Sequence, residues 1–341
     1  MERANGMAGK RVRIGVVGVG HLGKHHARLL QGLDCELVGV ADPSEAARAH
    51  AQATWNVPAF ADHRELLGKV DAVSVVVPTK LHREVATVFL ENGVDVLVEK
   101  PIARTSADGQ VLVDLATRHG RVLQVGHVER FNPALRAIAT IGESARYIES
   151  HRLAPFSFRS TDIGVVLDLM IHDLDLVLAL VHSEIVSVDA FGGAVFTPAE
   201  DMASAIIKFK NGAVAHLTAN RVALKPLRKM RVFSKQGYAS LDFQNSQGMV
   251  VKKAPGWDFG KLDLERLDRA QMGDLWKFVF DGLLQVENMQ LDSGNPLQEE
   301  LADFLRCVRD RAQPVVSGSD GVAAVAAAEQ VLAASAKNRW E

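Results

Sequence analysis

The sequence predicts an α/β protein with two domains, a doubly wound parallel sheet over residues 1–127 and a second α/β domain over residues 128–341. From residue 12 onward, short β-branched runs alternate with helix-like stretches, which is the rhythm of βαβ units. After residue 127, short strand-like runs follow one another without helices between them, which indicates an antiparallel sheet. Asn211-Gly212 joins two of these runs and is a strong hairpin signal.

The strand-like runs of the first domain are apolar on both faces, as the strands of a parallel sheet covered on both sides must be. Helix-like stretches separate these runs, so each pair of strands has room for a crossover helix. We expect strands at 12–19, 36–42, 71–77, 95–100 and 121–127, and helices at 22–32, 44–54, 80–92 and 105–119.

The second domain is predicted to begin with a helix near Asn132-Pro133 and to contain a strongly apolar helix over 163–182. The stretch 254–292 has no clear pattern, and we expect loops and a short helix there. The remaining expected strands are 145–153, 185–196, 202–210, 213–222, 228–235, 239–244 and 248–253, followed by helices at 295–311 and 319–338.

The composition is that of an ordinary soluble globular protein, with 48% hydrophobic and 23% charged residues. The formal net charge is −2 and no run of lysine and arginine stands out, so nothing favours nucleic-acid binding. Cys35 and Cys307 lie far apart, and we expect neither a disulfide framework nor a cysteine-based metal site. The first residues hold no apolar signal core, and the longest apolar segment carries charges that a membrane span would not. We therefore expect a soluble, cytoplasmic protein.

A glycine-rich segment, GVGHLG, directly follows the first expected strand and opens the first helix. Gly18 permits a tight turn, Gly20 lets the backbone approach a pyrophosphate, and Gly23 allows the helix to pack closely on the strand. Alone the motif is weak, because a turn that merely needs glycines has the same pattern. Asp42 ends the second strand, where a carboxylate binds a ribose 2′-hydroxyl and repels a 2′-phosphate, so we expect NAD rather than NADP. The expected cofactor contacts here are Gly18, Gly20, His21, Leu22, Gly23 and Asp42.

A second turn from strand to helix lies at VVVPTKLH, residues 75–82. Pro78 and Thr79 end the strand, and Thr79 is placed to cap the helix. Because the carboxyl ends of strands in open α/β sheets face the ligand, we expect Pro78, Thr79 and His82 near the cofactor. The alternative for Thr79 and His82 is that they belong to an ordinary turn between a strand and a helix.

Glu99-Lys100-Pro101 ends a further strand of the parallel sheet. Lysine is unusual at such a position, because its charge would be desolvated unless it pointed into the ligand cleft. The proline fixes the backbone, with a cis peptide bond as one option, and aims the lysine inward. Desolvation eases loss of the lysine proton, which suits Lys100 to proton transfer or to polarising a substrate oxygen. We expect Glu99, Lys100 and Pro101 to line the cofactor site, with a surface lysine at a strand tip as the alternative.

The apolar helix at 166–181 carries three carboxylates and an imidazole. On a helix, Asp168, His172 and Asp175 fall within roughly 60° of one another, and this narrow polar stripe is typical of a catalytic cleft. His172 suits a general base near neutral pH, and Asp168 or Asp175 could accept its other N–H. Asp173 points elsewhere and is expected to be structural. A satisfied structural histidine is one alternative, and a metal site is another, although no third ligand is identifiable.

Four motifs occur in order along the chain, namely Gly-x-Gly-x-x-Gly, Glu-Lys-Pro, Gly-His-x-x-Arg-Phe-Asn-Pro (126–133) and Asp-x-x-x-His. With them the chain resembles the Gfo/Idh/MocA oxidoreductase family over essentially its whole length. The resemblance implies a Rossmann domain joined to an α/β domain with a large, mostly antiparallel sheet, C-terminal helices that pack back toward the first domain, and a homodimer or homotetramer. It implies NAD(P)-dependent oxidation or reduction of a sugar or cyclitol carbon, with Lys100, Asp168 and His172 as the catalytic residues. Within the third motif we expect His127 at the cofactor and Arg130 and Asn132 at the substrate.

Three stretches, PTKLHREVA, VGHVERFNPAL and VLDLMIHDLDLVL, are similar to a narrower branch of that family, the UDP-N-acetylglucosamine 3-dehydrogenases of lipid A precursor synthesis. This likeness implies a UDP-sugar substrate, whose two phosphates call for fixed cations. Arg152 and Arg159 lie just before the catalytic helix and could supply bidentate phosphate contacts. Each of them, like Arg130 and Arg221, could instead be a surface or interdomain charge.

We therefore expect an NAD-dependent dehydrogenase of a sugar secondary alcohol, with C3 of UDP-N-acetylglucosamine as the first choice. His172 would take the hydroxyl proton, Lys100 would polarise the same oxygen and Asp168 would orient one of them, so no metal is needed. The likeness implies an aminotransferase that consumes the 3-keto product. Two alternatives stay open, a dehydrogenase of a free cyclitol or aldose such as inositol, and a non-catalytic sensor of NAD and a sugar. Lys100 and His172 argue against the sensor, which needs no acid–base pair.

Overall fold

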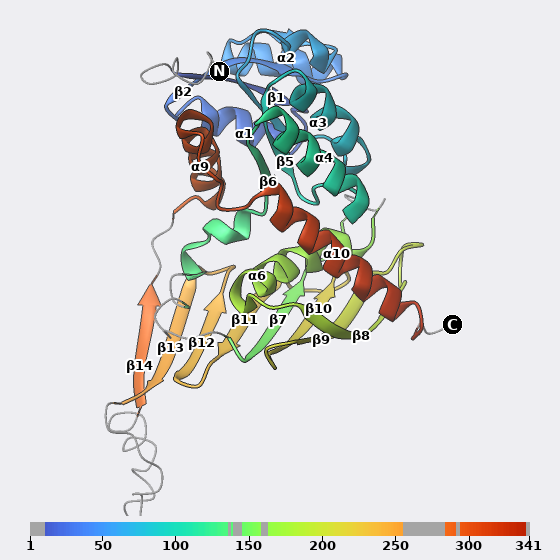
Figure 1. Ribbon diagram of the computed structural model, residues 1–341, viewed down its shortest axis with the longest axis vertical. Coiled ribbons are helices and arrows are strands. Elements are labelled where there is room, and N and C mark those ends of the chain that lie inside the picture. Colours follow the sequence, from blue (N-terminus) through green and yellow to red (C-terminus); the bar gives the residue numbers. More distant parts are fainter. Residues whose placement is uncertain are drawn as a thin grey trace, which may run out of the picture. The chain divides into compact units, whose positions relative to one another are not determined.

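The computed structural model describes residues 11–135, 138, 145–157, 163–254, 284–290 and 294–338 (Figure 1). The chain forms two compact units. The first comprises Met1–Phe131, Leu174–Leu176 and Asn295–Gln330. The second comprises Asn132–Asp173, Val177–Gly294 and Val331–Glu341.

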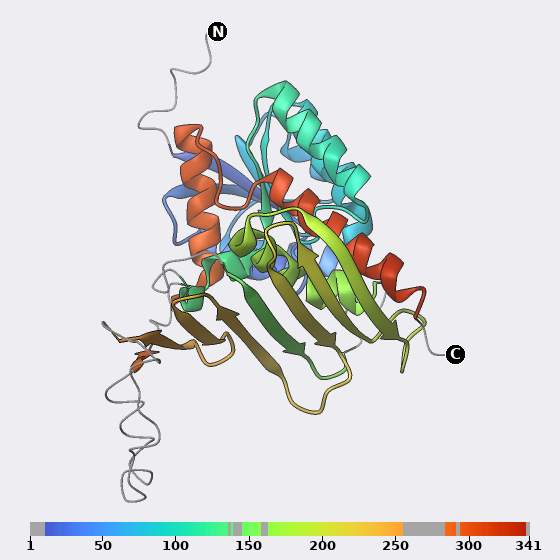
Figure 2. The ribbon, with the colours of Figure 1, turned by 60° about the horizontal axis from the view of Figure 1, so that its bottom comes forward.

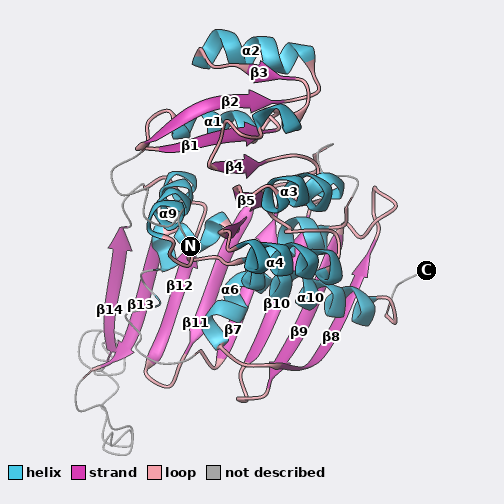
Figure 3. Cartoon of the chain, turned by 45° about the horizontal axis from the view of Figure 1, so that its top comes forward, coloured by secondary structure: helices cyan, strands magenta, loops and turns pink. Residues whose placement is uncertain are grey.

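The sheet of the first unit has six parallel strands in the order β3-β2-β1-β4-β5-β6 (Figure 3). This confirms the doubly wound sheet that the sequence predicts. β1 pairs with both β2 and β4, so the strand order reverses there, and ligands of such sheets bind beyond the carboxyl ends of the strands at this reversal. The short edge strand β3 was not predicted. The strands are β1 (Val12–Val17), β2 (Cys35–Ala41), β3 (Ala59–Phe60), β4 (Ala72–Val75), β5 (Asp95–Glu99) and β6 (Leu123–Gly126).

Helices α2 and α4 of this sheet begin after residues whose side chains satisfy one of their first N–H groups. Ser44 caps α2 by accepting from the Ala47 N–H at 3.3 Å, and Thr105 caps α4 by accepting from the Asp108 N–H at 3.1 Å. The late helix α9 belongs to the same unit, because its apolar face enters the core around β1. The helices are α1 (Gly23–Leu30), α2 (Glu45–Trp55), α3 (His82–Glu91), α4 (Ser106–His119), α9 (Pro296–Asp310) and α10 (Gly318–Ser335). The shared core includes Val12, Ile14, Val16, Leu30, Val40, Leu97, Leu301, Phe304 and Val308.

The sheet of the second unit has eight strands in the order β14-β13-β12-β11-β7-β10-β9-β8, which Figure 2 shows side by side. Only the β7–β10 pair is parallel among these neighbours, so the sheet is mostly antiparallel, as predicted. Gly212, at φ +83°, forms the expected hairpin turn between β9 and β10. The strands are β7 (Tyr147–Leu153), β8 (Ile185–Gly193), β9 (Met202–Phe209), β10 (Val214–Asn220), β11 (Leu227–Phe233), β12 (Gly237–Asp242), β13 (Gln247–Lys253) and β14 (Leu284–Gln290).

Two expectations for the second unit need correction. The stretch 254–292, expected to hold loops and a short helix, contains strand β14, whose sequence LQVENMQ has no sustained alternation of apolar and polar residues. Residues 255–283 and 291–292 lie outside the described residues. The helix expected over 163–182 begins as a π-helical segment at Val166–Met170 and continues as α6 (Ile171–Val181). Wide turns of this kind often occur at functional sites. Of the helix expected near Asn132-Pro133, the described residues are a short 3₁₀ turn at Pro133–Leu135 and the helical residue Ile138.

One face of the second sheet is buried and the other is partly exposed. On β10, Ala215, Leu217 and Ala219 are buried, and the residues between them are not. Within the described residues, no helix is both long enough and apolar enough to cross a bilayer.

Candidate active site

The glycine-rich loop joins β1 to α1 in a conformation that two of its glycines make possible. Gly18 has φ +85°, and a Cβ atom there would lie 2.3 Å from the Val76 carbonyl oxygen. A Cβ atom on Gly23 would lie 1.8 Å from the Gly18 oxygen. Gly20 is exposed, with no other atom within 4 Å of an added Cβ, so a pyrophosphate can approach the backbone there. His21 and Leu22 are exposed in the same loop.

Asp42 is fixed at the end of β2 beside this loop. Its Oδ2 accepts the Val19 N–H at 2.9 Å, and its Oδ1 accepts the Ser44 N–H at 2.8 Å. Each oxygen keeps a lone pair for a further donor, which is the geometry that a ribose hydroxyl needs. Arg48 Nη1 donates to the Asp42 and Pro43 carbonyl oxygens at 2.8 and 2.9 Å. The loop and this carboxylate therefore suit NAD.

The turn after β4 differs from the prediction in one respect. α3 begins at His82 with Leu81 at the N-cap position and no side-chain cap, so the capping role expected of Thr79 is wrong. Thr79 starts a 3₁₀ turn instead, and Pro78 precedes it. His82 is buried, with Nδ1 2.8 Å from the Pro101 oxygen and Nε2 2.9 Å from the Val77 oxygen. This ring connects the turn after β4 to the turn after β5, and burial lowers its pKa despite the two carbonyl contacts.

Lys100 follows β5 and is half-buried, and the Lys100–Pro101 peptide bond is cis, as the sequence suggested. Glu99 is buried, and its Oε2 accepts the Lys100 N–H at 3.2 Å. A Cβ atom on Gly126 would lie 3.0 Å from the Glu99 carboxyl group, so the glycine that ends β6 leaves space for this carboxylate. His26, for which the sequence predicts no role, also contacts this carboxylate, with its Nε2 3.1 Å from Glu99 Oε1. The available signal was a histidine on the buried face of α1, beside Ala27 and Leu30.

The third motif places two of its polar residues in the first unit. His127 is fully buried, and burial lowers its pKa. Arg130 forms a bidentate ion pair with Asp175, with Nε–Oδ2 and Nη2–Oδ1 distances of 2.7 and 2.9 Å. Both Asp175 oxygens therefore accept from Arg130, a partner that the sequence did not predict for this carboxylate. Asn132, in the second unit, is buried and accepts the Ala134 N–H at 3.0 Å.

In the second unit, Asp168 lies in the π-helical segment and His172 in the first turn of α6, and both are half-buried. The start of this segment is fixed by Glu200, whose Oε1 accepts the Val166 N–H at 3.2 Å. The two residues are four positions apart on consecutive turns, as the motif requires. Lys100, the third member of the expected catalytic set, belongs to the first unit.

The arginines expected to bind phosphates have structural partners where they are described. Arg152 is buried, and its Nε and Nη2 donate to Asp173 at 2.9 and 3.0 Å, which gives Asp173 the structural role expected of it. A guanidinium committed in this way does not support the phosphate assignment of Arg152. Arg221 is also buried and donates to Asp201, the Ile163 oxygen and Thr197. Arg159 lies outside the described residues.

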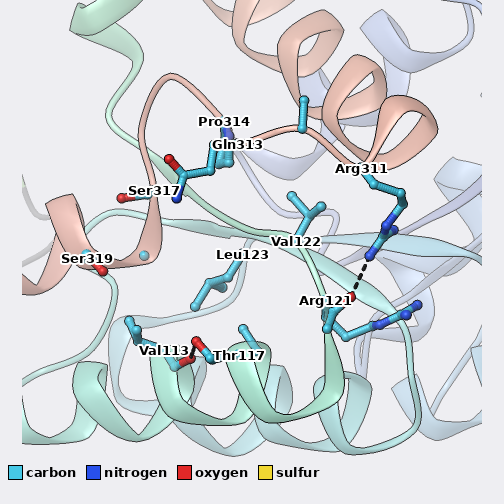
Figure 4. A pocket seen from close by; sticks show the side chains of 14 residues that line it. Val113, Thr117, Arg121, Val122, Leu123, Arg311, Gln313, Pro314, Ser317 and Ser319 are labelled. Carbon is cyan, nitrogen blue, oxygen red and sulfur yellow. Dashed lines mark hydrogen bonds between the residues drawn. The ribbon is translucent and has the colours of Figure 1, made fainter.

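The hollow in Figure 4 is separate from these residues. It has a volume of about 330 Å³ and lies between the end of α4, the start of β6 and the loop before α10. Arg311 donates to the Gly120 oxygen at 2.7 Å there (Figure 4). None of the expected site residues lines it, and it lies at the amino end of β6, whereas ligands of such sheets bind at the carboxyl ends. In the described ranges, no three His, Cys, Asp or Glu side chains are grouped as a metal site would need.

Comparison with known proteins agrees with the observed fold. Residues 12–127 match the model of the oxidoreductase family with an NAD-binding Rossmann fold, and residues 143–240 match the GFO/IDH/MocA C-terminal domain. The chain belongs to the Gfo/Idh/MocA family and is an NAD-binding oxidoreductase.

Individual relatives narrow the comparison. The chain is 38% identical to UDP-N-acetylglucosamine 3-dehydrogenase of Acidithiobacillus ferrooxidans, over 95% of this chain and 97% of that protein. A solved structure of that enzyme from the same organism superposes with a TM-score of 0.83 at 36% identity, covering 96% of this chain and 99% of the other. The NAD-dependent scyllo-inositol 2-dehydrogenase of Bacillus subtilis is 30% identical over 62% of this chain and 68% of its own length.

Proposed function

We propose that this protein oxidises a secondary alcohol of a sugar with NAD, and that its substrate is UDP-N-acetylglucosamine, which becomes the 3-keto sugar. The observation that carries the proposal is the 38% identity to UDP-N-acetylglucosamine 3-dehydrogenase over nearly the full length of both chains. The glycine-rich loop and the fixed carboxylate of Asp42 support the cofactor, and the residues of the Glu-Lys-Pro and Asp-x-x-x-His motifs support the chemistry.

NAD supplies the hydride acceptor when it is bound. In the proposed reaction His172 takes the proton from the C3 hydroxyl group, and Lys100 donates a hydrogen bond to the same oxygen as negative charge develops there. Asp168 orients one of these two groups. The first unit binds the cofactor, with Glu99, Pro101 and His127 beside Lys100, and the second unit binds the sugar and forms the contacts between subunits.

The proposal is tested by following NADH absorbance with UDP-N-acetylglucosamine, myo-inositol and glucose as parallel substrates. We expect turnover with the nucleotide sugar, and His172→Ala should lower kcat by about a hundredfold or more because a general base is lost. His182→Asn is the matched control, because His182 is exposed at the end of the same helix and its left-handed backbone, at φ 48°, tolerates asparagine. A decrease below about threefold in His172→Ala would remove that residue from the role.

A free cyclitol is the alternative substrate class, and the likeness to scyllo-inositol 2-dehydrogenase favours including it. Arg159→Ala separates the two classes, because a phosphate contact matters only for a nucleotide sugar. Arg152→Ala is a poorer test, since it would leave the buried Asp173 without its ion-pair partner whatever the substrate. NAD binding without NADH formation on any sugar would indicate a sensor.

We further propose that the chain forms a homodimer or homotetramer through the partly exposed face of the second sheet. Tyr147, Phe233 and Tyr238 form an aromatic row across neighbouring strands of this face, with ring centroids 5.8 and 5.3 Å apart. Phe191 and Ile206, 45% and 42% exposed, extend the apolar surface.

The two buried free cysteines fit a protein of the reducing cytoplasm. An aminotransferase is the class of enzyme that would consume the 3-keto product.

A further inference from the structure

A buried chain of polar side chains crosses the first unit and ends at the residue before Lys100. His26 on α1 and Ser74 on β4 are both fully buried, and Glu99 ends β5. His26 Nδ1 lies 2.9 Å from Ser74 Oγ, and His26 Nε2 lies 3.1 Å from Glu99 Oε1. The second contact is close, although its angle is not that of an ideal hydrogen bond. Three elements that are distant in sequence therefore meet at this imidazole.

The partners of His26 fix where its protons lie. Burial alone would raise the pKa of Glu99, but the contact with His26 and the nearby ammonium group of Lys100 lower it, so Glu99 is a carboxylate at neutral pH. A carboxylate only accepts, so Nε2 of His26 carries a proton. In the neutral ring Nδ1 then has to accept, and Ser74 donates its hydroxyl proton to it. Ser74 thus sets the tautomer that allows His26 to face Glu99.

A serine, a histidine and a carboxylate that contact one another in this order resemble a nucleophilic triad, but this network of side chains cannot act as one. Ser74 is in the interior of the sheet and is 0% exposed, as is His26, so no substrate reaches the hydroxyl group. Of the three side chains, Glu99 alone is next to an expected catalytic residue. The network therefore acts toward Lys100.

Glu99 connects this network to the turn that carries Lys100. Its Oε2 accepts the Lys100 N–H at 3.2 Å, and Gly126 leaves room for the carboxyl group on the β6 side. On the other side of the turn, His82 contacts the Pro101 carbonyl oxygen at 2.8 Å. The backbone of the turn is thus held at both ends, by His26 through Glu99 and by His82.

We propose that His26 is a positioning residue for the reaction: it holds the Glu99 carboxylate in place, and Glu99 holds the turn that presents Lys100. This inference rests on the proposed function, because it takes Lys100 as the residue that polarises the substrate oxygen. It adds to that function a residue that touches neither sugar nor cofactor.

The first test uses the cofactor-free protein and does not depend on activity. Infrared difference spectra are recorded during acid titration, and the carbonyl band of protonated Glu99 is identified by its absence in Glu99→Gln. In the wild type this band should appear only below the usual range of a glutamate. In His26→Leu it should appear at clearly higher pH, because burial then raises the pKa of Glu99 without the opposing contact from His26. The other ionisable groups that face Glu99 are Lys100, His82, His127 and Glu300. His25→Leu, a half-buried neighbour on the same helix, is the matched control and should titrate like the wild type.

The second test follows NADH formation with UDP-N-acetylglucosamine. His26→Leu should lower kcat by about tenfold or more and move the acid limb of the kcat profile to higher pH, while the Kd for NAD changes by less than about threefold. His26→Gln, which keeps an N–H near the position of Nε2, should recover most of the loss. Should His26→Leu not fold, His26→Gln and Ser74→Ala carry the test, with smaller changes of the same sign.

Two results would overturn the proposal. One is a folded His26→Leu protein with an unchanged kcat. The other is a loss of activity in His26→Leu that is equally large in His26→Gln, or that comes wholly from a weaker Kd for NAD. If the wild type oxidises no sugar, the proposed function fails. The infrared titration then still decides whether His26 holds Glu99, and an unchanged Glu99 titration would end this inference separately.

Discussion

The carboxyl end of β5 and the buried face of α9 each contain a buried glutamate, and the two are in opposite states. Glu99 faces His26 and the Lys100 N–H, and its pKa is lowered. Glu300 is 0% exposed, and neither of its carboxyl oxygens has a hydrogen-bond partner among the described residues. Its pKa is raised well above the usual value by burial, and then by the negative charges of Glu99, Asp303 and Asp175. Burial by itself therefore does not decide the charge of a carboxyl group in this protein; the partners decide it.

The position of Glu300 follows from the pattern of α9. Glu300 precedes Leu301 on the face of α9 that buries Phe304 and Val308. When this face packs into the core, the Glu300 side chain is therefore buried with its apolar neighbours. Gln124 Nε2 donates to the backbone oxygen of Glu300 at 3.0 Å and leaves the carboxyl group without a donor. A neutral, protonated acid is the form that such a site tolerates.

The largest effect is expected when the environment of Glu99 is made like that of Glu300. His26→Leu removes the imidazole, and leaving a buried carboxylate without its partner costs about 3–5 kcal/mol. Because the Lys100 N–H remains, we expect the low end, a loss of about 3 kcal/mol in the free energy of unfolding by urea near neutral pH. His25→Leu should change it by less than about 1 kcal/mol.

The pH dependence gives this prediction its sign. The pKa of Glu99 is lower in the folded protein than its reference value of 4.5, so its contribution to stability is present above the unfolded pKa and is lost as the pH falls through the folded pKa. In His26→Leu that contribution disappears and burial raises the pKa of Glu99, so the variant loses further stability as the pH rises through that raised value. The difference from the wild type should therefore be larger at about pH 8 than at about pH 5. An equal loss at both values would mean that His26 contributes packing alone.

The next effect has the opposite sign. The pKa of Glu300 is raised in the folded protein, so its stabilising contribution is complete below the unfolded pKa and is lost as the pH rises through the folded pKa. Glu300→Gln removes the ionisation, and we expect a gain of about 1–3 kcal/mol in urea unfolding at alkaline pH and little gain at about pH 5. Glu299→Gln, at the exposed neighbouring position, is the control and should be near neutral. A loss of stability in Glu300→Gln at alkaline pH would show that the carboxylate has a partner there.

The same contrast separates what the sequence could predict from what it could not. Period and spacing are local, so the alternation of strands and helices, the turn at Gly18 and the Lys100–Pro101 turn could be predicted from short segments. The partner of a buried charge is not local. His26 lies 48 residues before Ser74 in the chain, and Arg130 lies 45 residues before Asp175, and no period in the sequence connects such pairs.

Helical geometry alone also could not reveal the ion-pair partner of Asp175. Both of its carboxylate oxygens accept from the guanidinium of Arg130, which comes from another segment. Arg152 and Asp173 show the same effect on the other side of the helix. Strand β14 was missed for a different reason, because at a sheet edge its residues are largely exposed and carry no apolar alternation.

The smallest effect tests how far the network extends from the carboxylate. Ser74→Ala removes the hydroxyl group that faces His26 Nδ1 and leaves a buried nitrogen without a donor, which costs about 1 kcal/mol in urea unfolding. Alanine fits the buried strand without adding volume, so packing should change little. In the His26→Leu background the same substitution should cost almost nothing, because its partner is already gone. Equal costs in both backgrounds would mean that Ser74 acts through the strand and not through the imidazole, and the tautomer of His26 would then be set by Glu99 alone.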